Sequence, residues 1–190
     1  MWWNDMNIFA IEKSPVDCAK SMVDKHVVKM ILETAQLLST AHRVIDGQMI
    51  EYNKMVAGSL PPRWRKTKKW ELPDARENVL YSATHINHPS SIWCRVSNNN
   101  YNWLYAHFLA LLDEYTYRYG KTHKCNSLVD ALRSPPIGIP VSYLTPVTPA
   151  MPDEYKVPHD SLQSYRNYYK QGKAHLHKWT KREQPEWMTA

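Results

Sequence analysis

The stretch SPVDCAKSMVDKHVVKMILETAQLLSTAHRVIDG, residues 14–47, decides the fold of this chain. Ser14 is suited to capping a helix, Pro15 to its first position, and Asp17 completes a pattern similar to a capping box. Small and apolar residues then recur at steps of three and four until Gly47 ends the pattern, which predicts one long amphipathic helix. These residues are Ala19, Val23, Val27, Met30, Thr34, Leu37, Leu38 and Ala41.

A second long helix is predicted further along the chain. Ser97 or Asn98 can cap it, and Gly120 is suited to the position just after its C-terminus. Apolar residues between these points again follow the helical period. Glu114 and Arg118, four residues apart, are spaced for a structural ion pair.

The C-terminal part of the sequence is of mixed character. Residues 134–158 are rich in proline and are predicted to run over the surface in an extended form. Asp160 can cap a last helix from Ser161 to about Trp179. Residues 183–190 are expected to form a flexible tail.

Together these elements predict an all-α fold. We expect one compact domain over residues 1–182, with two long crossing helices, a C-terminal helix packed over them and long irregular surface loops. The chain has 190 residues, 43% of them hydrophobic, and no stretch approaches 18 consecutive apolar residues. Three widely spaced cysteines and the absence of a secretory signal pattern favour a reducing, cytoplasmic location.

The overall charge and the aromatic residues favour a nucleic acid as partner. The formal net charge is +6, and eight Trp and twelve Tyr stand against only two Phe. Trp and Tyr stack on bases, whereas a core alone would use more Phe. We expect DNA, with double-stranded DNA favoured, no membrane contact and a monomer. Only five glycines occur and no Walker or Rossmann pattern is present, so no cofactor is expected.

The densest run of charge lies in residues 48–72, which are predicted to form an irregular basic loop. Positive charges for phosphates alternate there with tryptophans that can stack. An alternative is an exposed loop that serves only solubility. The candidate nucleic-acid contacts in this loop are Arg63, Trp64, Arg65, Lys66, Lys68, Lys69 and Trp70.

The first long helix carries a polar stripe beside its apolar one, formed by His26, Lys29, Glu33, Gln36, Thr40 and Arg43. One interpretation is a solvated face with a Lys29–Glu33 ion pair. The other is a face that lines a cleft, with Glu33 as general acid or base and with His26 and Lys29 binding phosphate.

Two further groups of residues could bind a ligand. Asn98 and Asn100, at the start of the second long helix, could bring phosphate to free backbone amides, although ordinary capping explains them as well. His85 and His88 have the spacing H-x-x-H, but no carboxylate is placed beside them, so no metal site is expected.

One motif resembles a known family. The run Asp24-Lys25-His26-Val27-Val28-Lys29-Met30-Ile31-Leu32-Glu33 is similar to the central helix motif of pyrimidine-dimer DNA glycosylases of the phage endonuclease V type. That motif has an Asp or Asn, a His two residues later, and a Glu seven residues after the His. The element His88-Pro89 ahead of a long helix is also similar. So is a late aromatic cluster, here Tyr165, Tyr168 and Tyr169. The chain also resembles uncharacterised tailed-phage proteins of similar length.

The resemblance implies a DNA glycosylase acting on damaged or modified bases, in a phage protein inside the bacterial host cell. Glu33 would be the catalytic carboxylate, with His26 and Lys29 beside it and Lys25 and His88 among the DNA contacts. The family uses an N-terminal amine to form a Schiff base with the sugar. Here the sequence starts Met1-Trp2-Trp3 and has Leu32 and Gln36 where the family carries arginines.

The sequence leaves several alternatives open. The amine could be that of Met1, or Lys29 or Lys25 could replace it, or AP-lyase chemistry could be absent. The chain could also be a non-catalytic nucleic-acid-binding protein on the same scaffold. A third alternative is a phage accessory protein that binds a host factor or a nucleotide.

Overall fold

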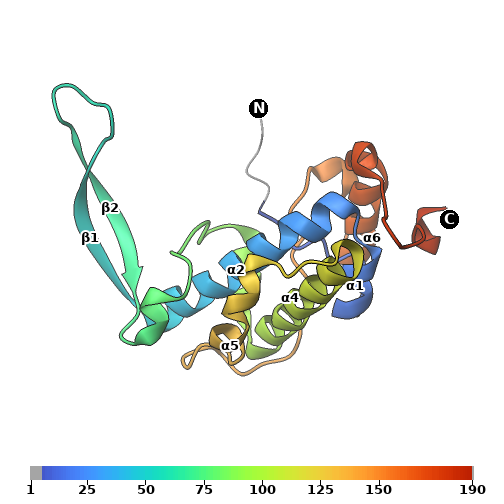
Figure 1. Ribbon diagram of the computed structural model, residues 1–190, viewed down its shortest axis with the longest axis horizontal. Coiled ribbons are helices and arrows are strands. Elements are labelled where there is room, and N and C mark those ends of the chain that lie inside the picture. The colour runs from blue at the N-terminus through green and yellow to red at the C-terminus, as the bar shows by residue number, and fades with distance from the viewer. Residues whose placement is uncertain (1–5, 190) are drawn as a thin grey trace.

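A computed structural model of the chain describes residues 6–189 (Figure 1). Most regular structure within them is helical, with one antiparallel pair of strands. The α-helices are α1 (Pro15–Ser21), α2 (Asp24–Asp46), α3 (Pro89–Val96), α4 (Asn98–Tyr119), α5 (Val129–Leu132) and α6 (Ser161–Asn167). The strands are β1 (Gln48–Met55) and β2 (Trp64–Glu71).

The predicted first helix is two helices. The chain leaves the helical conformation at Met22 and Val23, whose ψ angles are 144° and 155°. Partners from the C-terminal part of the chain compensate for the break. The Val23 N–H donates to the Tyr169 hydroxyl at 2.9 Å, and the Asp24 N–H donates to the Lys178 carbonyl at 2.8 Å. Because the apolar period continues through the break, the sequence pattern alone did not reveal it.

The two long helices, α2 and α4, contact each other in the core, as do α1 and α4 (Figure 1). The predicted ends of α4 are confirmed. Ser97 caps its N-terminus through its hydroxyl, and Gly120 follows its C-terminus with a φ of 66°, the left-handed conformation that favours glycine. Ile31, Leu38, Phe108 and Leu111 are fully buried and form part of this core.

The prediction of an all-α fold is wrong, because residues 48–71 form a β-hairpin and not an irregular loop. We call Gln48–Glu71 the arm. Its strands pair in one register from Gln48 opposite Glu71 to Met55 opposite Trp64. Figure 1 shows it projecting from the helices at the end of α2. The β-favouring residues of both strands are interleaved with charged ones, and this interleaving hid the alternation typical of a strand.

The last predicted helix is also shorter than expected. Asp160 caps α6 as predicted, but α6 ends at Asn167 and a wider π-helical turn covers Tyr168–Gly172. A side chain at Gly172 would come within 2.5 Å of the Tyr168 ring, so glycine permits this close turn.

In the region predicted to be a flexible tail, Trp187 is docked, because its indole N–H donates to Glu12 Oε1 at 2.6 Å.

Helices long and apolar enough to cross a membrane do not occur among residues 6–189.

Candidate active site

The polar stripe of α2 brings Lys29 and Glu33 into contact. Lys29 Nζ lies 3.0 Å from Glu33 Oε1. The other oxygen of this carboxylate, Oε2, accepts a hydrogen bond from the Asn7 backbone N–H at 3.1 Å. Glu33 is only 8% exposed, whereas half of the Lys29 side chain surface remains accessible. The pair therefore consists of an oriented, buried carboxylate and an accessible amine.

Segment 6–11 holds the Asn7 N–H in place. The Asn7 side chain is buried, accepts the N–H groups of Ile8 and Phe9, and donates to the Ala150 carbonyl at 2.7 Å. Phe9 has a φ of 52°, which is unusual for a bulky residue and costs about 1–3 kcal/mol. In this conformation its ring stacks on His26 with 4.3 Å between centroids.

His26 precedes Lys29 by three residues on α2 and is almost fully buried. Its Nδ1 is 3.0 Å from the Tyr169 hydroxyl. Burial, helped by the nearby charges of Lys173 and Lys29, lowers the pKa of His26 to about 3. The buried ring of His26 packs between the aromatic rings of Phe9 and Tyr169.

A cleft of about 550 Å³ adjoins Asn7, within the size range of small-molecule sites. His88 and Asn7 both line this cleft, so the predicted residue His88 lies near the residue whose backbone N–H binds the Glu33 carboxylate. His88 also caps α3 through its Nδ1. The other lining residues are residues 6–7, Pro89, residues 149–152, Lys156 and Tyr168.

The structure does not bring the arm to Glu33. The arm begins after Asp46, thirteen residues beyond Glu33 on the same helix, which corresponds to about 20 Å along the axis. Lys25 is exposed and lies eight residues before Glu33, about 12 Å away along α2. Met1, Trp2 and Trp3, with the candidate terminal amine, lie outside the described residues.

The two asparagines at the start of α4 hold the extended segment. Asn100 is fully buried, donates to the Trp93 carbonyl and to Thr145 Oγ1, and accepts the Thr145 N–H. Asn98 accepts the Ser142 N–H through its side chain. The side-chain amides of both asparagines therefore already bind groups of the protein itself.

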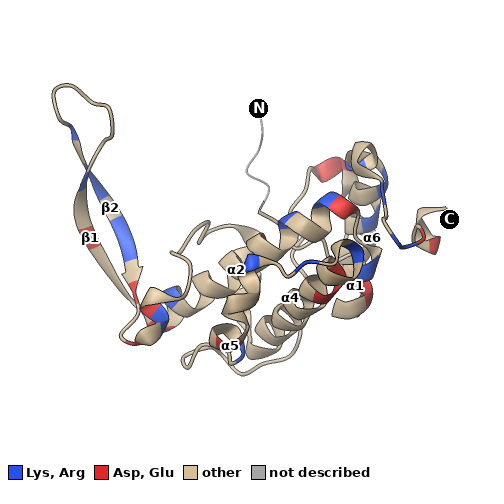
Figure 2. Cartoon of the chain, in the orientation of Figure 1, with Lys and Arg blue, Asp and Glu red and all other residues tan. Residues whose placement is uncertain are grey.

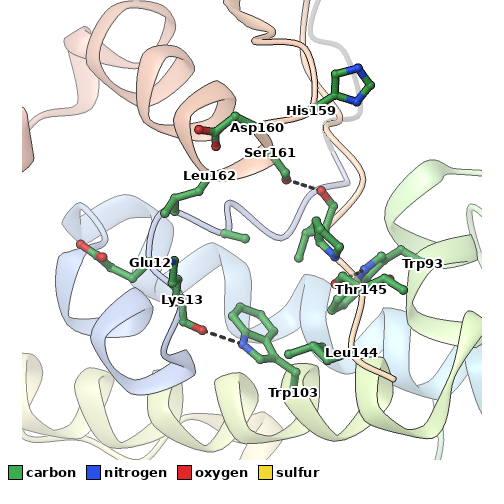
Figure 3. Close-up of a pocket in the computed structure, with 13 residues that line it drawn as sticks. Glu12, Lys13, Trp93, Trp103, Leu144, Thr145, His159, Asp160, Ser161 and Leu162 are labelled. Carbon is green, nitrogen blue, oxygen red and sulfur yellow. Dashed lines mark hydrogen bonds between the residues drawn. The ribbon is translucent and has the colours of Figure 1, made fainter. Parts of the chain in front are cut away.

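A second cleft, of about 400 Å³, lies between α4, residues 144–147 and the start of α6 (Figure 3). Trp93 and Trp103 form one wall. Their indole N–H groups donate to the carbonyls of Thr145 and Lys13. Glu12, which also lines it, is engaged by Arg166 and Trp187. This cleft is largely apolar and contains none of the predicted catalytic residues.

The sequence pattern missed Asn7, which binds Glu33, and Phe9, which stacks on His26. It also missed Lys156, which lines the cleft, and Lys173, whose ammonium lies over the Phe9 ring. No periodic signal could place Asn7 beside Glu33, because its contribution is a backbone N–H. The resemblance did point to the late tyrosines. Tyr165, Tyr168 and Tyr169 indeed surround Phe9, with ring centroids 5.8–6.3 Å from its ring. Among residues 6–189, no group of three His, Cys, Asp or Glu side chains is arranged to hold a metal ion.

The fold and this site define a mostly helical protein with a buried carboxylate that an exposed lysine and the backbone of a cleft-lining residue both contact. Residues 6–127 match the model of the family described as pyrimidine dimer DNA glycosylase, and the chain belongs to that family. The match confirms the resemblance found in the sequence. It covers α1 to α4, the arm, and the Lys29–Glu33 pair. No curated protein and no solved structure matches the chain significantly.

Proposed function

We propose that this protein is a DNA glycosylase that releases a damaged or modified base, with Glu33 as its catalytic carboxylate. The observation that carries the proposal is the Lys29–Glu33 contact of 3.0 Å at a carboxylate that is 8% exposed. A buried anion close to C1′ stabilises the positive charge that the sugar develops as the glycosidic bond breaks. The cleft beside Asn7 is the place for the sugar and the base.

Lys29 is the amine that we assign to a lyase step. Its neutral form would attack C1′ and form a C–N bond while the bond to the base breaks. The base leaves with the electron pair and takes up a proton. Opening of the sugar ring then gives an iminium ion, from which loss of a C2′ proton expels the 3′ phosphate. Lys25 lies too far from Glu33 to exchange a proton with it directly.

Glu33→Gln tests the catalytic assignment. Under single turnover on a duplex with a pyrimidine dimer or an abasic site, we expect base release or strand cleavage to fall about a thousandfold or more. DNA affinity should change little. Asp113→Asn, an exposed carboxylate on α4, is the matched control and should keep full activity. If Glu33→Gln stays as active as this control, Glu33 is not the catalytic carboxylate.

Borohydride trapping on an abasic duplex tests the amine. We expect a covalent adduct that mass spectrometry maps to Lys29 and that Lys29→Arg abolishes, since arginine keeps the charge beside Glu33 but does not form the imine. An adduct within residues 1–5 would instead identify the terminal amine. Base release without any adduct would identify a glycosylase that lacks lyase activity.

A further inference from the structure

The arm concentrates the positive charge of the chain. Residues 48–71 hold six basic and two acidic side chains, so the arm carries a net +4 of the chain's +6. Figure 2 shows the basic residues following β2 away from the helices. With eight residues a strand, each strand extends about 27 Å. The arm is therefore a long cationic projection.

Cations occupy both faces of this two-stranded ribbon. Side chains alternate along β2, so Trp64, Lys66 and Lys68 point to one face and Arg65 and Lys69 to the other. Lys68 contacts Glu51 at 3.7 Å in an exposed pair, and Lys69 lies within 3.2 Å of Glu71 and Glu77.

The outer half of the arm has no such neutralisation. Lys54, Arg63, Arg65 and Lys66 are exposed, and no carboxylate of residues 6–189 lies within 4 Å of them. Three large side chains beside them are also exposed: Trp64 at 65%, Met55 at 53% and Tyr52 at 40%. Unpaired cations interleaved with exposed aromatic rings are suited to a polyanion that has flat bases.

The base of the arm, in contrast, is fixed to the helices. Arg43, almost fully buried near the end of α2, donates to the carbonyl of Trp70 and to Glu77. A side chain at Gly47 would meet the Arg43 carbonyl at 2.4 Å and the Glu71 carbonyl at 2.9 Å, so the strands leave α2 through a tight junction. The arm is therefore held at a set distance from Glu33, about 20 Å along α2.

We propose that the arm is a second DNA-binding element, which holds duplex DNA outside the cleft at Glu33. This inference rests on the proposed function, because it takes from it that the ligand is DNA. Arg63, Arg65 and Lys66 contact phosphates, and Trp64 packs against the groove. A two-stranded ribbon fits the major groove, which is about 12 Å wide. The base of the arm lies about 20 Å from Glu33 along α2, which corresponds to roughly six base pairs at about 3.4 Å for each pair. The outer half projects farther from the helices (Figure 1), so its phosphate contacts lie beyond that distance from the target base.

The first test is the salt dependence of binding to an undamaged duplex of thirty base pairs. The triple variant Arg63→Gln, Arg65→Gln, Lys66→Gln should reduce the slope of log K against log salt by about 3, or 0.9 for each lost phosphate contact. Its affinity at low salt should fall tenfold or more. The control, Lys121→Gln, Lys124→Gln, Arg133→Gln, removes the same charge from exposed positions elsewhere and should change the slope by less than about 1.

A second variant removes the arm without relying on single side chains. Residues 50–69 are replaced by Asn-Gly, which joins Met49 to Trp70 through a tight turn. Its helical circular dichroism should match that of the wild type, and its duplex affinity should fall at least as far as that of the triple variant. The proposal is wrong if both variants keep the wild-type salt slope and duplex affinity. It is also wrong if they lose affinity only for an RNA or a protein and keep it for duplex DNA.

The two proposals fail in different ways. If the wild type shows the arm-dependent salt slope but releases no base, the glycosylase assignment is wrong and the arm proposal holds. If Glu33→Gln abolishes base release while the arm variants bind DNA like the wild type, the glycosylase assignment holds and the arm proposal is wrong.

Discussion

Arg118 in the helices and Arg65 in the arm are both arginines in regular elements, but their surroundings differ completely. The side chain of Arg118 is fully buried and contacts Glu114 at 2.7 Å, Asp24 at 2.9 Å and the Lys20 carbonyl. Arg65 is exposed, and no carboxylate of the described chain neutralises it. Charge in the helical body is used to join elements, whereas charge in the arm remains available to a partner.

The largest expected effect tests the first half of this comparison. Arg118→Met should lower the free energy of unfolding by about 3–5 kcal/mol, because Asp24 loses its cationic partner and the buried Glu114 keeps only Arg182. Urea unfolding followed by tryptophan fluorescence measures it. Arg133→Met is the control. Its pair with Asp130 is exposed, so a loss above about 1 kcal/mol there would contradict the distinction.

A smaller effect is expected at the junction between the two regions. Arg43→Lys keeps the charge, but an ammonium cannot make the set of bonds that the guanidinium makes to the carbonyls of Trp70, Glu77, Leu80 and Tyr81. We expect a loss of about 2–3 kcal/mol. Hydrogen exchange should accelerate in the strands of the arm far more than in α4. Equal acceleration in both would show that the arm is not held separately at its base.

Acid should destabilise the helical body, which contains buried neutral histidines. Burial lowers the pKa of His107 to about 4 and that of His26 to about 3. Both lie below the ordinary value of 6.5, so the unfolded chain takes up protons first as the pH falls. The stabilisation is complete above about pH 6.5 and is lost progressively towards the pKa values of the folded state.

His107→Leu measures this contribution at one residue. Between pH 6.5 and 5 the unfolding free energy of the wild type should fall more steeply than that of the variant, by up to about 1.4 kcal/mol for each pH unit. Urea midpoints at four pH values are sufficient. Parallel curves for the two proteins would show that His107 does not set the acid sensitivity.

The sequence predicted the features that local spacing controls. Ser97 and Gly120 marked the ends of α4, and the spacing of four residues placed Lys29 beside Glu33 and Glu114 beside Arg118. Both residues of each pair lie on the same helix, so the helical period of the sequence is sufficient to predict the contact.

Interactions between distant parts of the chain were not predictable in this way. Tyr169 contacts His26 from 143 residues away, and Asn7 reaches Glu33 from 26 residues away through a backbone group that every sequence has. The arm was missed for a related reason. Its base is held by Arg43, whose partners lie 27 to 38 residues further along the chain. The run of charge in the sequence therefore identified the arm as basic but did not predict that it forms a hairpin.

The smallest expected effect on stability is at the outer part of the arm. Trp64 is 65% exposed and Trp93 is 2% exposed, so the same substitution separates the two regions. Trp93→Ala should cost about 3–5 kcal/mol, because it leaves a cavity in the wall formed with Trp103. Trp64→Ala should change the unfolding free energy by less than about 0.5 kcal/mol. Since Trp64 packs against little of its own protein, a large loss of stability would mean that the arm folds back on the helices in solution. It would then not be available to DNA.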